Sequence, residues 1–483
     1  MPSIDNSKPN IIFILTDDQG YWSLGAYGNR EARTPNLDSL AANGMRFDNF
    51  FCVSPVCSPA RASLLTGRIP SRHGIHDFLN GGDINDLSVE PKGNGRAIEY
   101  LEGQPGYTDF LNDAGYACGI SGKWHLGDSH NPQKGFKYWK VHAIGGGHYY
   151  NAPMVKNGEV YYENRYITDV ITDNALLFLE EQKDGKNPFY LSIHYTAPHS
   201  PWERKEHPVE YYDYFYDNCN FESVPDGIVP AEWIEGLSIP VDNAEKRREY
   251  LSGYYGAVAA MDANVGKILD WLDKNNLTKS TLICFTSDNG MNMGHHGIYG
   301  KGNATFPLNM YEESVKVPFI MSLPGKIPSG MVKKELLSHY DFMPTLLDYL
   351  GIDMPNDNKL PGKSFASLLN GEKFGGGGTV VVFDEYGPVR MIRNEKFKYV
   401  HRYPYGPFEL YSLEDDPNET INLYGNLNFE SKVLEMRTEL YRWFNKYIDP
   451  EFDGLKEPVD GGGQCYWAGL RGINEKNYPG KVW

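Results

Sequence analysis

The stretch IIFILTDDQG, residues 11–20, constrains the fold more than any other segment of this sequence. Its first five residues are all apolar and three of them are β-branched, which is typical of a central strand in a parallel sheet covered on both faces by helices. Asp17 and Asp18 follow the strand directly. Because ligands bind beyond the carboxyl ends of the strands in open α/β sheets, the stretch predicts an α/β fold with a site at this strand end.

A second stretch, TLICFTSDNG at residues 281–290, repeats the pattern and delivers Asp288 and Asn289. Asp, Asn and Gly also end strands for local hydrogen-bonding reasons, and that explanation suffices for either pair taken alone. Together, three carboxylates and one amide are a hard, oxygen-rich set that suits Ca²⁺ or Mg²⁺. The two strand ends therefore predict a metal site.

The segment CSPARASLLTGR, residues 57–68, predicts the start of a helix. Ser58 offers a capping hydroxyl and Pro59 suits the first helical position, so we expect Cys57 just before the helix. Arg61 then lies about one turn along on the same side, where its charge and the helix N-terminus favour an anion. A single Cys is more often only a buried apolar residue, so the prediction rests on the whole pentapeptide.

Three further segments carry residues suited to acid–base chemistry. In GISGKWHLG, residues 119–127, the alternation along a strand sends Lys123 and His125 to one face and Trp124 to the other. The segment FYLSIHYTAPHSPW at 189–202 predicts a strand followed by a Pro-rich turn, and GHHGIYGKG at 294–302 contains Lys301.

These segments resemble the type I sulfatases of the alkaline phosphatase superfamily, and more closely the carbohydrate sulfatases than the small-aryl ones. The similarity lies in C-x-P-x-R at 57–61, G-K-W-H-x-G at 122–127, a T-x-P-H turn at 196–199, and a Lys after G-x-H-G followed by a Tyr-Glu-Glu box at 311–313. It covers most of the chain. The resemblance implies hydrolysis of a sulfate ester to sulfate and an alcohol.

The resemblance also implies the cofactors and the residues of the site. A maturation enzyme would oxidise Cys57 to formylglycine, whose hydrate is the nucleophile. Calcium, rather than magnesium, would be held by Asp17, Asp18, Asp288, Asn289 and an oxygen of the modified Cys57.

The same resemblance assigns the catalytic roles. Arg61, Lys123 and Lys301 would hold the sulfate oxygens. His194 would protonate the leaving alcohol, and His125 would accept the proton of the second hydroxyl. We interpret His199, in its Pro-rich turn, as structural.

Two rival functions stay open. One is a formylglycine-dependent phosphonate or phosphate ester hydrolase of the same superfamily, and the other is a non-catalytic binder of sulfated ligands, should Cys57 remain a thiol. A sulfated sugar or oligosaccharide is the expected substrate, but its binding residues are not predicted. Trp202, the loop at 461–467, His295 and His296 are candidates to line the pocket mouth.

Composition limits the partners and the compartment. The net charge of −17 over 483 residues argues against nucleic acid, which is bound mainly through an excess of Lys and Arg. No run of about 18 apolar residues occurs, so no transmembrane span is expected. The first ten residues are polar and lack the apolar core of a secretory signal, so we expect a cytoplasmic protein unless a signal was removed.

The sequence predicts two domains. Residues 1–354 form a catalytic α/β/α domain with a mixed, mostly parallel sheet, as in alkaline phosphatase. Residues 355–483 form a small α+β domain, with short antiparallel strands at 379–383, 389–392, 397–401 and 409–411 and a helix at 431–447 packed on them.

Overall fold

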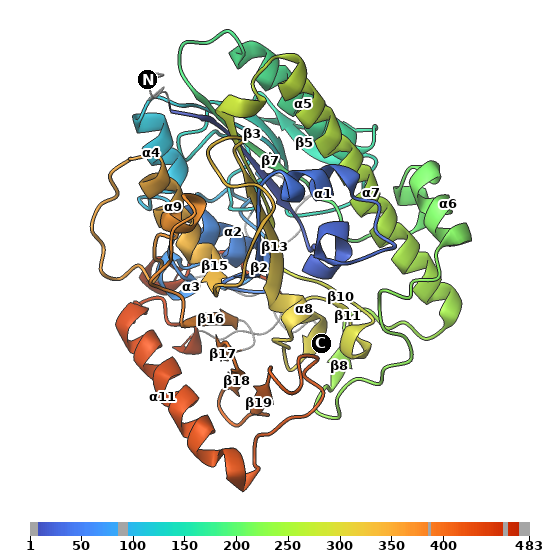
Figure 1. Cartoon of the computed structure of the whole chain (residues 1–483), viewed down its shortest axis with the longest axis vertical. Coiled ribbons are helices and arrows are strands. Elements are labelled where there is room, and N and C mark those ends of the chain that lie inside the picture. Colours follow the sequence, from blue (N-terminus) through green and yellow to red (C-terminus); the bar gives the residue numbers. More distant parts are fainter. Residues whose placement is uncertain (1–7, 86–94, 385–387, 457–461, 473–483) are drawn as a thin grey trace.

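The computed structural model describes residues 8–85, 95–384, 388–456 and 462–472. A large sheet runs through its upper part, in the strand order β14-β2-β13-β9-β1-β7-β3-β4-β5-β6, with β15 paired to β2 (Figure 1). The strands of this sheet are β1 (Asn10–Thr16), β2 (Met45–Phe51), β3 (Ala117–Lys123), β4 (Tyr138–His142), β5 (Ala152–Lys156), β6 (Glu159–Glu163), β7 (Phe189–His194), β9 (Thr281–Ser287), β13 (Lys316–Ser322), β14 (Met331–Lys333) and β15 (Leu337–Ser338).

The centre of the sheet is parallel, antiparallel pairs lie on both sides of it, and the short strands β14 and β15 pair in parallel with β2 at one edge. β1 pairs in parallel with β7 and β9, and β3 pairs in parallel with β7 and β4. β13 runs antiparallel to β2 and β9, and β5 runs antiparallel to β4 and β6. The predicted mixed, mostly parallel sheet is therefore confirmed.

Helices cover both faces of the sheet, which explains why β1 is apolar throughout. Ile12 and Ile14 belong to the core on the side of α1 (Pro35–Ala42), α5 (Ile167–Gln182) and α7 (Ala244–Lys274). Ile11, Phe13 and Leu15 belong to the core on the side of α2 (Cys57–Thr66), α4 (Tyr107–Asp113) and α9 (His339–Tyr349). Figure 1 shows the two helical layers on either side of the strands. Side chains alternate between the faces of a strand, so both sets must be apolar.

The small sheet near the C-terminus has the predicted form. Its order is β16 (Thr379–Asp384), β17 (Val389–Asn394), β18 (Phe397–Arg402) and β19 (Glu409–Ser412), all antiparallel. The helix α11 (Glu430–Tyr447) packs on this sheet through Met436, Leu440 and Phe444, all of them buried. Figure 1 shows this unit in orange and red below the large sheet.

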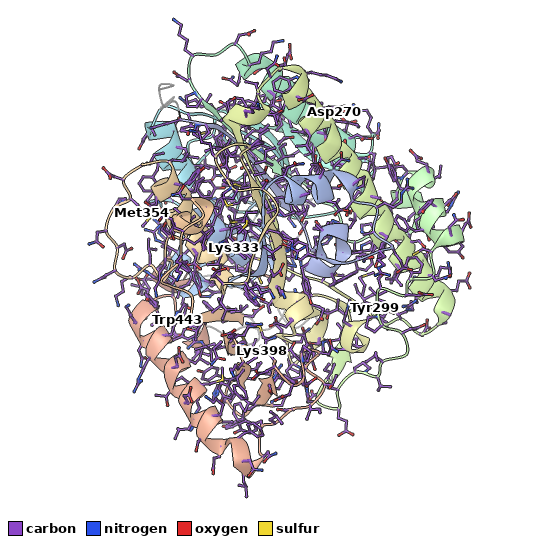
Figure 2. The ribbon with its side chains drawn as sticks, in the orientation of Figure 1. Asp270, Tyr299, Lys333, Met354, Lys398 and Trp443 are labelled. Carbon is purple, nitrogen blue, oxygen red and sulfur yellow. The ribbon has the colours of Figure 1, made fainter. Side chains whose placement is uncertain are left out.

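A buried ion cluster joins the small sheet to the large domain. Lys398 of β18, marked in Figure 2, lies 3.1 Å from Glu312 and 2.6 Å from Glu419. Arg393 of β17 lies 3.2 Å from Glu312. Glu312 begins the short helix α8 (Glu312–Val315), which leads directly into β13 of the large sheet. Pairing satisfies these charges away from water and fixes how the two sheets meet.

The remaining helices and strands are short or lie outside the two main sheets. They are α3 (Pro70–His73), α6 (Val209–Asn218), α10 (Ala366–Leu369), β8 (Gly236–Leu237), β10 (Asn292–Met293), β11 (Tyr299–Gly300) and β12 (Thr305–Phe306). Within the part of the chain that the structure describes, none of the helices combines the length and apolar character needed to span a bilayer.

Two leucines of α11 test how the small sheet is held. Leu440 is fully buried, whereas Leu434 is 55% exposed on the same helix. We expect Leu440→Ala to lower the free energy of unfolding by about 2 to 5 kcal/mol, because it leaves a cavity in the core. Leu434→Ala should change it by less than about 0.5 kcal/mol. Urea unfolding followed by circular dichroism measures both, and equal losses would contradict the packing described for α11.

Candidate active site and metal centre

The site begins where two neighbouring strands end. Thr16 of β1 lies opposite Ser287 of β9, so the residues that follow the two strands meet at one edge of the sheet. The Asp288 amide donates to the Thr16 carbonyl at 3.1 Å, and the Asp18 amide donates to Asp288 Oδ1 at 3.1 Å. Asn289 Nδ2 donates to Asp18 Oδ1 at 2.8 Å. Parallel register therefore gathers the predicted oxygen donors.

The helix that carries Cys57 starts two residues earlier than the sequence suggests. α2 begins at Cys57 itself, with Val56 as the cap residue, so Pro59 is the third helical residue rather than the first. The Ser58 hydroxyl does not cap the helix and instead accepts a hydrogen bond from the Leu79 amide at 3.1 Å. The expected cap was wrong because a tertiary partner takes this hydroxyl.

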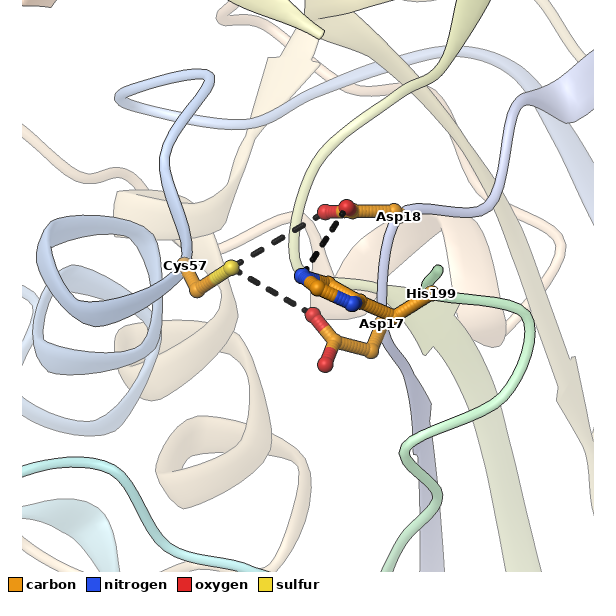
Figure 3. Close-up of side chains that lie close together, drawn as sticks. All are labelled: Asp17, Asp18, Cys57 and His199. Carbon is orange, nitrogen blue, oxygen red and sulfur yellow. Dashed lines mark hydrogen bonds and ion pairs between the residues drawn. The ribbon is translucent and has the colours of Figure 1, made fainter. Parts of the chain in front are cut away.

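Cys57 points at the two acids of β1. Its Sγ lies 3.4 Å from Asp17 Oδ1 and 3.8 Å from Asp18 Oδ1. Figure 3 shows the sulfur facing both carboxylates. Lys301 Nζ lies 2.7 Å from the same sulfur. Burial, reinforced by the charge of Asp17, raises the pKa of the Cys57 thiol well above its usual range. An unmodified Cys57 would therefore stay a neutral thiol and a poor nucleophile.

Three cations are matched to the three carboxylates. Lys123 Nζ lies 2.6 Å from Asp17 and Lys301 Nζ lies 2.6 Å from Asp18. Arg61 Nε lies 2.8 Å from Asp288. All six side chains are buried, so their formal charges cancel within the cluster.

The cations govern how the carboxylates titrate. Burial alone would raise the pKa of Asp288, but Arg61 and then Lys123 outweigh it and hold that pKa well below its usual range. For Asp18, the effect of burial is likewise overcome, by Lys301 and His199, and the pKa is lowered. Burial keeps the pKa of Asp17 raised in spite of Lys123. Asp18 and Asp288 are thus anionic at neutral pH and can act as cation ligands.

The donor set fits a divalent cation. Asn289 Oδ1 is buried and has no hydrogen-bond partner among the described residues, so it presents a free oxygen beside the carboxylates. Ligand atoms of Asp17, Asp18, Cys57 and His199 lie within 4.8 Å of one another. Carboxylate and amide oxygens are the ligands that hard cations prefer. A divalent ion here would leave the neutral cluster with two positive charges, which favours an anionic ligand.

Lys123 and His125 reach the pocket from the end of β3, while Trp124 packs behind it against Trp139 and Phe136. His125 Nε2 donates to the Leu79 carbonyl at 2.9 Å. Because a carbonyl can only accept, Nε2 carries the proton and Nδ1 keeps its lone pair. Nδ1 is buried and has no hydrogen-bond partner in the described part of the chain, and burial lowers the pKa of His125 well below its usual range. The ring is therefore a neutral proton acceptor.

The structure brings His199, and not His194, to the pocket. His194 ends β7 and its Nδ1 lies 3.0 Å from the Lys123 carbonyl, with its ring against Phe13. Burial, with the nearby Arg61, lowers the pKa of His194 to about 3. His199 lines the pocket, and its Nε2 lies 3.6 Å from Asp18 Oδ2 (Figure 3).

The course of the chain after β7 explains this difference. The Asp17 amide donates to the Ala197 carbonyl at 3.1 Å, so the turn after β7 is held against the end of β1. That contact places His199 beside Asp18. The T-x-P-H turn at 196–199 was the available signal, and its last residue is the one that faces the pocket.

The pocket itself has a volume of about 400 Å³. Sequence reasoning missed most of its wall, which is made by Phe78, Leu79, Asn80, Asp83, Ile144, Gly145, Gly146, Gly147 and Asn303 around Cys57, Lys123, His125, His199 and Lys301. A Cβ at Gly145 would stand 2.1 Å from the His125 ring, so only glycine allows this approach. The run of three glycines was the signal in the sequence.

Arg61 and the candidates for the pocket mouth lie elsewhere. Arg61 sits behind Asp288 and donates to the Lys123 carbonyl at 3.1 Å, so it supports the pocket and does not line it. Trp202 is 2% exposed and packs against Tyr250 and Tyr254, so the prediction that it lines the mouth was wrong.

The two adjacent histidines and the late loop are also outside the lining. The His295 ring packs against Trp22 at a tilt, and His296 stacks on Tyr311 and bonds to Glu313, so neither lines the pocket. Residue 461 lies outside the described residues, and the rest of its loop, 462–467, contacts the back of the pocket wall through Asn80.

Comparison with known proteins gives a consistent result. The family described as Sulfatase matches residues 9–352, and the family described as N-sulphoglucosamine sulphohydrolase, C-terminal, matches residues 294–446. The chain is 28% identical to an N-acetylglucosamine-6-O-sulfatase of Bacteroides thetaiotaomicron, over 93% of this chain and 88% of that protein. It is 31% identical to an N-acetylgalactosamine-6-sulfatase of Canis lupus familiaris, over 75% of this chain and 66% of the relative.

A solved structure shares the whole architecture. It is described as a complex with its substrate D-glucosamine-2-N,6-O-disulfate, and it superposes with a TM-score of 0.79 at 25% identity. The alignment covers 93% of this chain and 100% of that one.

The oxygen cluster can be tested by cation binding. We expect Asp18→Asn to weaken Ca²⁺ binding by about tenfold or more, because one carboxylate near a cation contributes about 4 kcal/mol per unit charge at a partly buried site. Asp48→Asn is the control, since Asp48 is paired with Arg46 on β2 outside the pocket. Isothermal titration calorimetry measures both. Equal affinities for the parent and Asp18→Asn would remove Asp18 from the ligand set.

Proposed function

The chain belongs to the sulfatase family and is a sulfuric ester hydrolase, and from that premise we propose that it removes sulfate from a sulfated sugar in the Cys57 pocket. The observation that carries the proposal is the position of Cys57. It lies at the start of α2, between two acids suited to a cation and two lysines suited to an anion.

Relatives and pocket size support a sugar as the substrate. The similar proteins include sulfatases of N-acetylglucosamine and N-acetylgalactosamine, and the similar structure holds a glucosamine disulfate. A volume of about 400 Å³ lies within the range of about 300 to 1,000 Å³ that is usual for small-molecule sites. The glycines at 145–147 line the pocket with backbone beside His125 and His199, and backbone N–H and C=O groups are suited to the hydroxyls of a sugar.

Two groups that the family uses would complete the site. Formylglycine made from Cys57 by a maturation enzyme would offer, when hydrated, two hydroxyls on one carbon, one to attack sulfur and one to drive the release of sulfate. A divalent cation, by the family resemblance calcium, would be held by Asp17, Asp18, Asp288 and Asn289 and would polarise the oxygen at position 57.

The lysines and His199 act on the first half of the reaction. Lys123 and Lys301 line the pocket beside Cys57 and would hold the sulfate oxygens, where negative charge builds as the ester bond breaks. His199 is the proposed acid that protonates the departing sugar oxygen, because it lines the pocket and its side chain is 27% exposed, whereas His125 is 4% exposed. His194 is only half-buried, but its pKa is lowered to about 3, so the ring is neutral at pH 7 and does not suit a proton donor.

His125 and Arg61 have different proposed roles, one in proton transfer and one in positioning. His125 presents an unprotonated, buried Nδ1 and would accept the proton of the second hydroxyl as sulfate leaves. Arg61 pairs with Asp288 and bonds to the carbonyl of Lys123, so it would keep a ligand and a sulfate-binding residue in place. Both roles follow from contacts that these residues already make.

The proposal is tested by chemistry at Cys57. Protein produced together with a maturation enzyme should contain formylglycine, detected by mass spectrometry of the peptide spanning residues 53–61, and should release sulfate from a sulfated amino sugar. Cys57→Ala should lose essentially all of this activity, because the nucleophile is gone. Full activity in protein whose Cys57 is unmodified would contradict the mechanism.

A side-by-side comparison of sulfate and phosphonate esters of one alcohol serves as the control for substrate class. A larger kcat/KM for the phosphonate would favour a phosphonate hydrolase. Tight binding of the sulfated sugar without turnover by the modified protein would favour a binding role.

The assignment of the acid is tested by two histidine variants. We expect His199→Gln to lower kcat by about 10²- to 10⁴-fold on a sulfated sugar, and by much less on an aryl sulfate whose leaving group needs no proton. His194→Gln is the matched control and should retain most of kcat on both substrates. The melting temperature of each variant separates loss of folding from loss of chemistry. Substrate-dependent loss in His194→Gln, with none in His199→Gln, would reverse the assignment.

A further inference from the structure

The backbone of Leu79 connects the two parts of the pocket where the chemistry is proposed to occur. Its amide donates to the hydroxyl of Ser58, the neighbour of Cys57, at 3.1 Å. Its carbonyl accepts the proton of His125 Nε2 at 2.9 Å. Leu79 thus decides which nitrogen of His125 carries the proton, since the ring keeps its hydrogen on the side of the carbonyl.

Leu79 lies in a segment, residues 74–80, that has neither a helix nor a sheet of its own. The backbone of this segment pairs instead with the C-terminal part of the chain. The Gln464 amide donates to the Phe78 carbonyl at 2.8 Å, and the Asn80 amide donates to the Gln464 carbonyl at 2.8 Å. These two bonds form a parallel bridge that pairs Leu79 with Gln464.

The side chain of Gln464 adds a second set of bonds to the same segment. Its Oε1 accepts from the His76 amide at 2.8 Å, and its Nε2 donates to the carbonyls of Gly74 at 2.9 Å and Tyr466 at 2.8 Å. Gln464 is fully buried, so these bonds are made without competition from water. The amide thus holds the segment at Gly74 and His76, while its bond to Tyr466 fixes the side chain within its own loop.

The residue before Gln464 shows how closely the two segments approach. Gly463 has a φ of +83°, and a Cβ there would stand 2.6 Å from Cβ of Asn80 and 2.7 Å from the ring of Phe78. Phe78, Leu79 and Asn80 all line the pocket. The C-terminal segment is therefore pressed against the outer side of the pocket wall.

We propose that Gln464 is a positioning residue of the active site. It holds Leu79, the Leu79 carbonyl keeps the proton of His125 on Nε2, and His125 Nδ1 is thereby left free to accept the proton released in the second half of the reaction. The proposal rests on the role given to His125 under the proposed function. Without Gln464, the carbonyl shifts, and His125 divides between its two tautomers.

The test compares Gln464→Leu with Asn264→Leu. Leucine keeps the approximate shape of each side chain and removes the amide. Asn264 is also buried and makes three side-chain hydrogen bonds, to Asp169, the Ala260 carbonyl and Lys267, but it lies on α7 away from the pocket. It therefore reports the general effect of deleting a buried amide.

We expect Gln464→Leu to lower kcat by about 100-fold, since small displacements in a catalytic geometry have effects of that size. KM should change little, because Lys123 and Lys301 keep their places. Asn264→Leu should lower the melting temperature and leave kcat unchanged.

A spectroscopic readout separates positioning from loss of stability. In protein with an unmodified Cys57 and nitrogen-labelled histidines, NMR should show the His125 proton on Nε2, with the signal assigned by its absence in His125→Gln. In Gln464→Leu, the signal should move toward a mixture of tautomers, and in Asn264→Leu it should not. A His125 proton that stays on Nε2 in Gln464→Leu, or a loss of kcat no greater than that of the control, would overturn the proposal.

Gly463→Ala provides a second variant should Gln464→Leu fail to fold. It retains the amide of Gln464 and displaces the bridge by overlap with Phe78 and Asn80, so the same shift in tautomer and kcat is expected, and an unchanged His125 would again overturn the proposal. A parent protein that hydrolyses no sulfated sugar would contradict the proposed function, while the tautomer measurement would still decide the role of Gln464.

Discussion

Buried carboxylates and buried cations in equal number are the constraint around which this molecule is organised. Three acids at the ends of β1 and β9 are removed from water, and each is paired with a cation from a different part of the chain. An unpaired charge in such a place would cost several kcal/mol. The pairing therefore ties α2, the end of β3 and the loop after β11 to the same point, and a divalent cation would turn the neutral cluster into a site for an anion.

The sheet supplies the geometry for this pairing. Because β1 and β9 are parallel neighbours in register, the residues that follow them meet without any long loop. The helices on either face exclude water from the strands. The low local dielectric strengthens the charge interactions at the strand ends. The histidines then lie on the open side, where Gly145 and Gly146 allow the chain to cover them closely. The strands that form the hydrophobic core therefore also position the charged groups of the site.

Much of this could be predicted from local patterns, and the exceptions have physical reasons. The strands at 11–15 and 281–286, the antiparallel sheet and the helix at 431–447 were predicted because periodicity and turn residues act over short distances. The start of α2 was misplaced by two residues because Ser58 is used by Leu79 and not by the helix. His194 was preferred to His199 because His199 lies in a Pro-rich turn that was interpreted as structural, while a contact of Asp17 with Ala197 decided which histidine faces the pocket.

The sequence by itself determined the class of fold, the family and the acids, lysines and cysteine of the site, because these lie in motifs whose members are close together in the chain. Only the tertiary structure decided that His199 faces the pocket, that Arg61 supports it from behind, and that the C-terminal segment braces its wall. Gln464 and His76 are 388 residues apart, and no periodicity or spacing links them. Such contacts are set by how packed elements meet, and packing is a property of the whole folded chain.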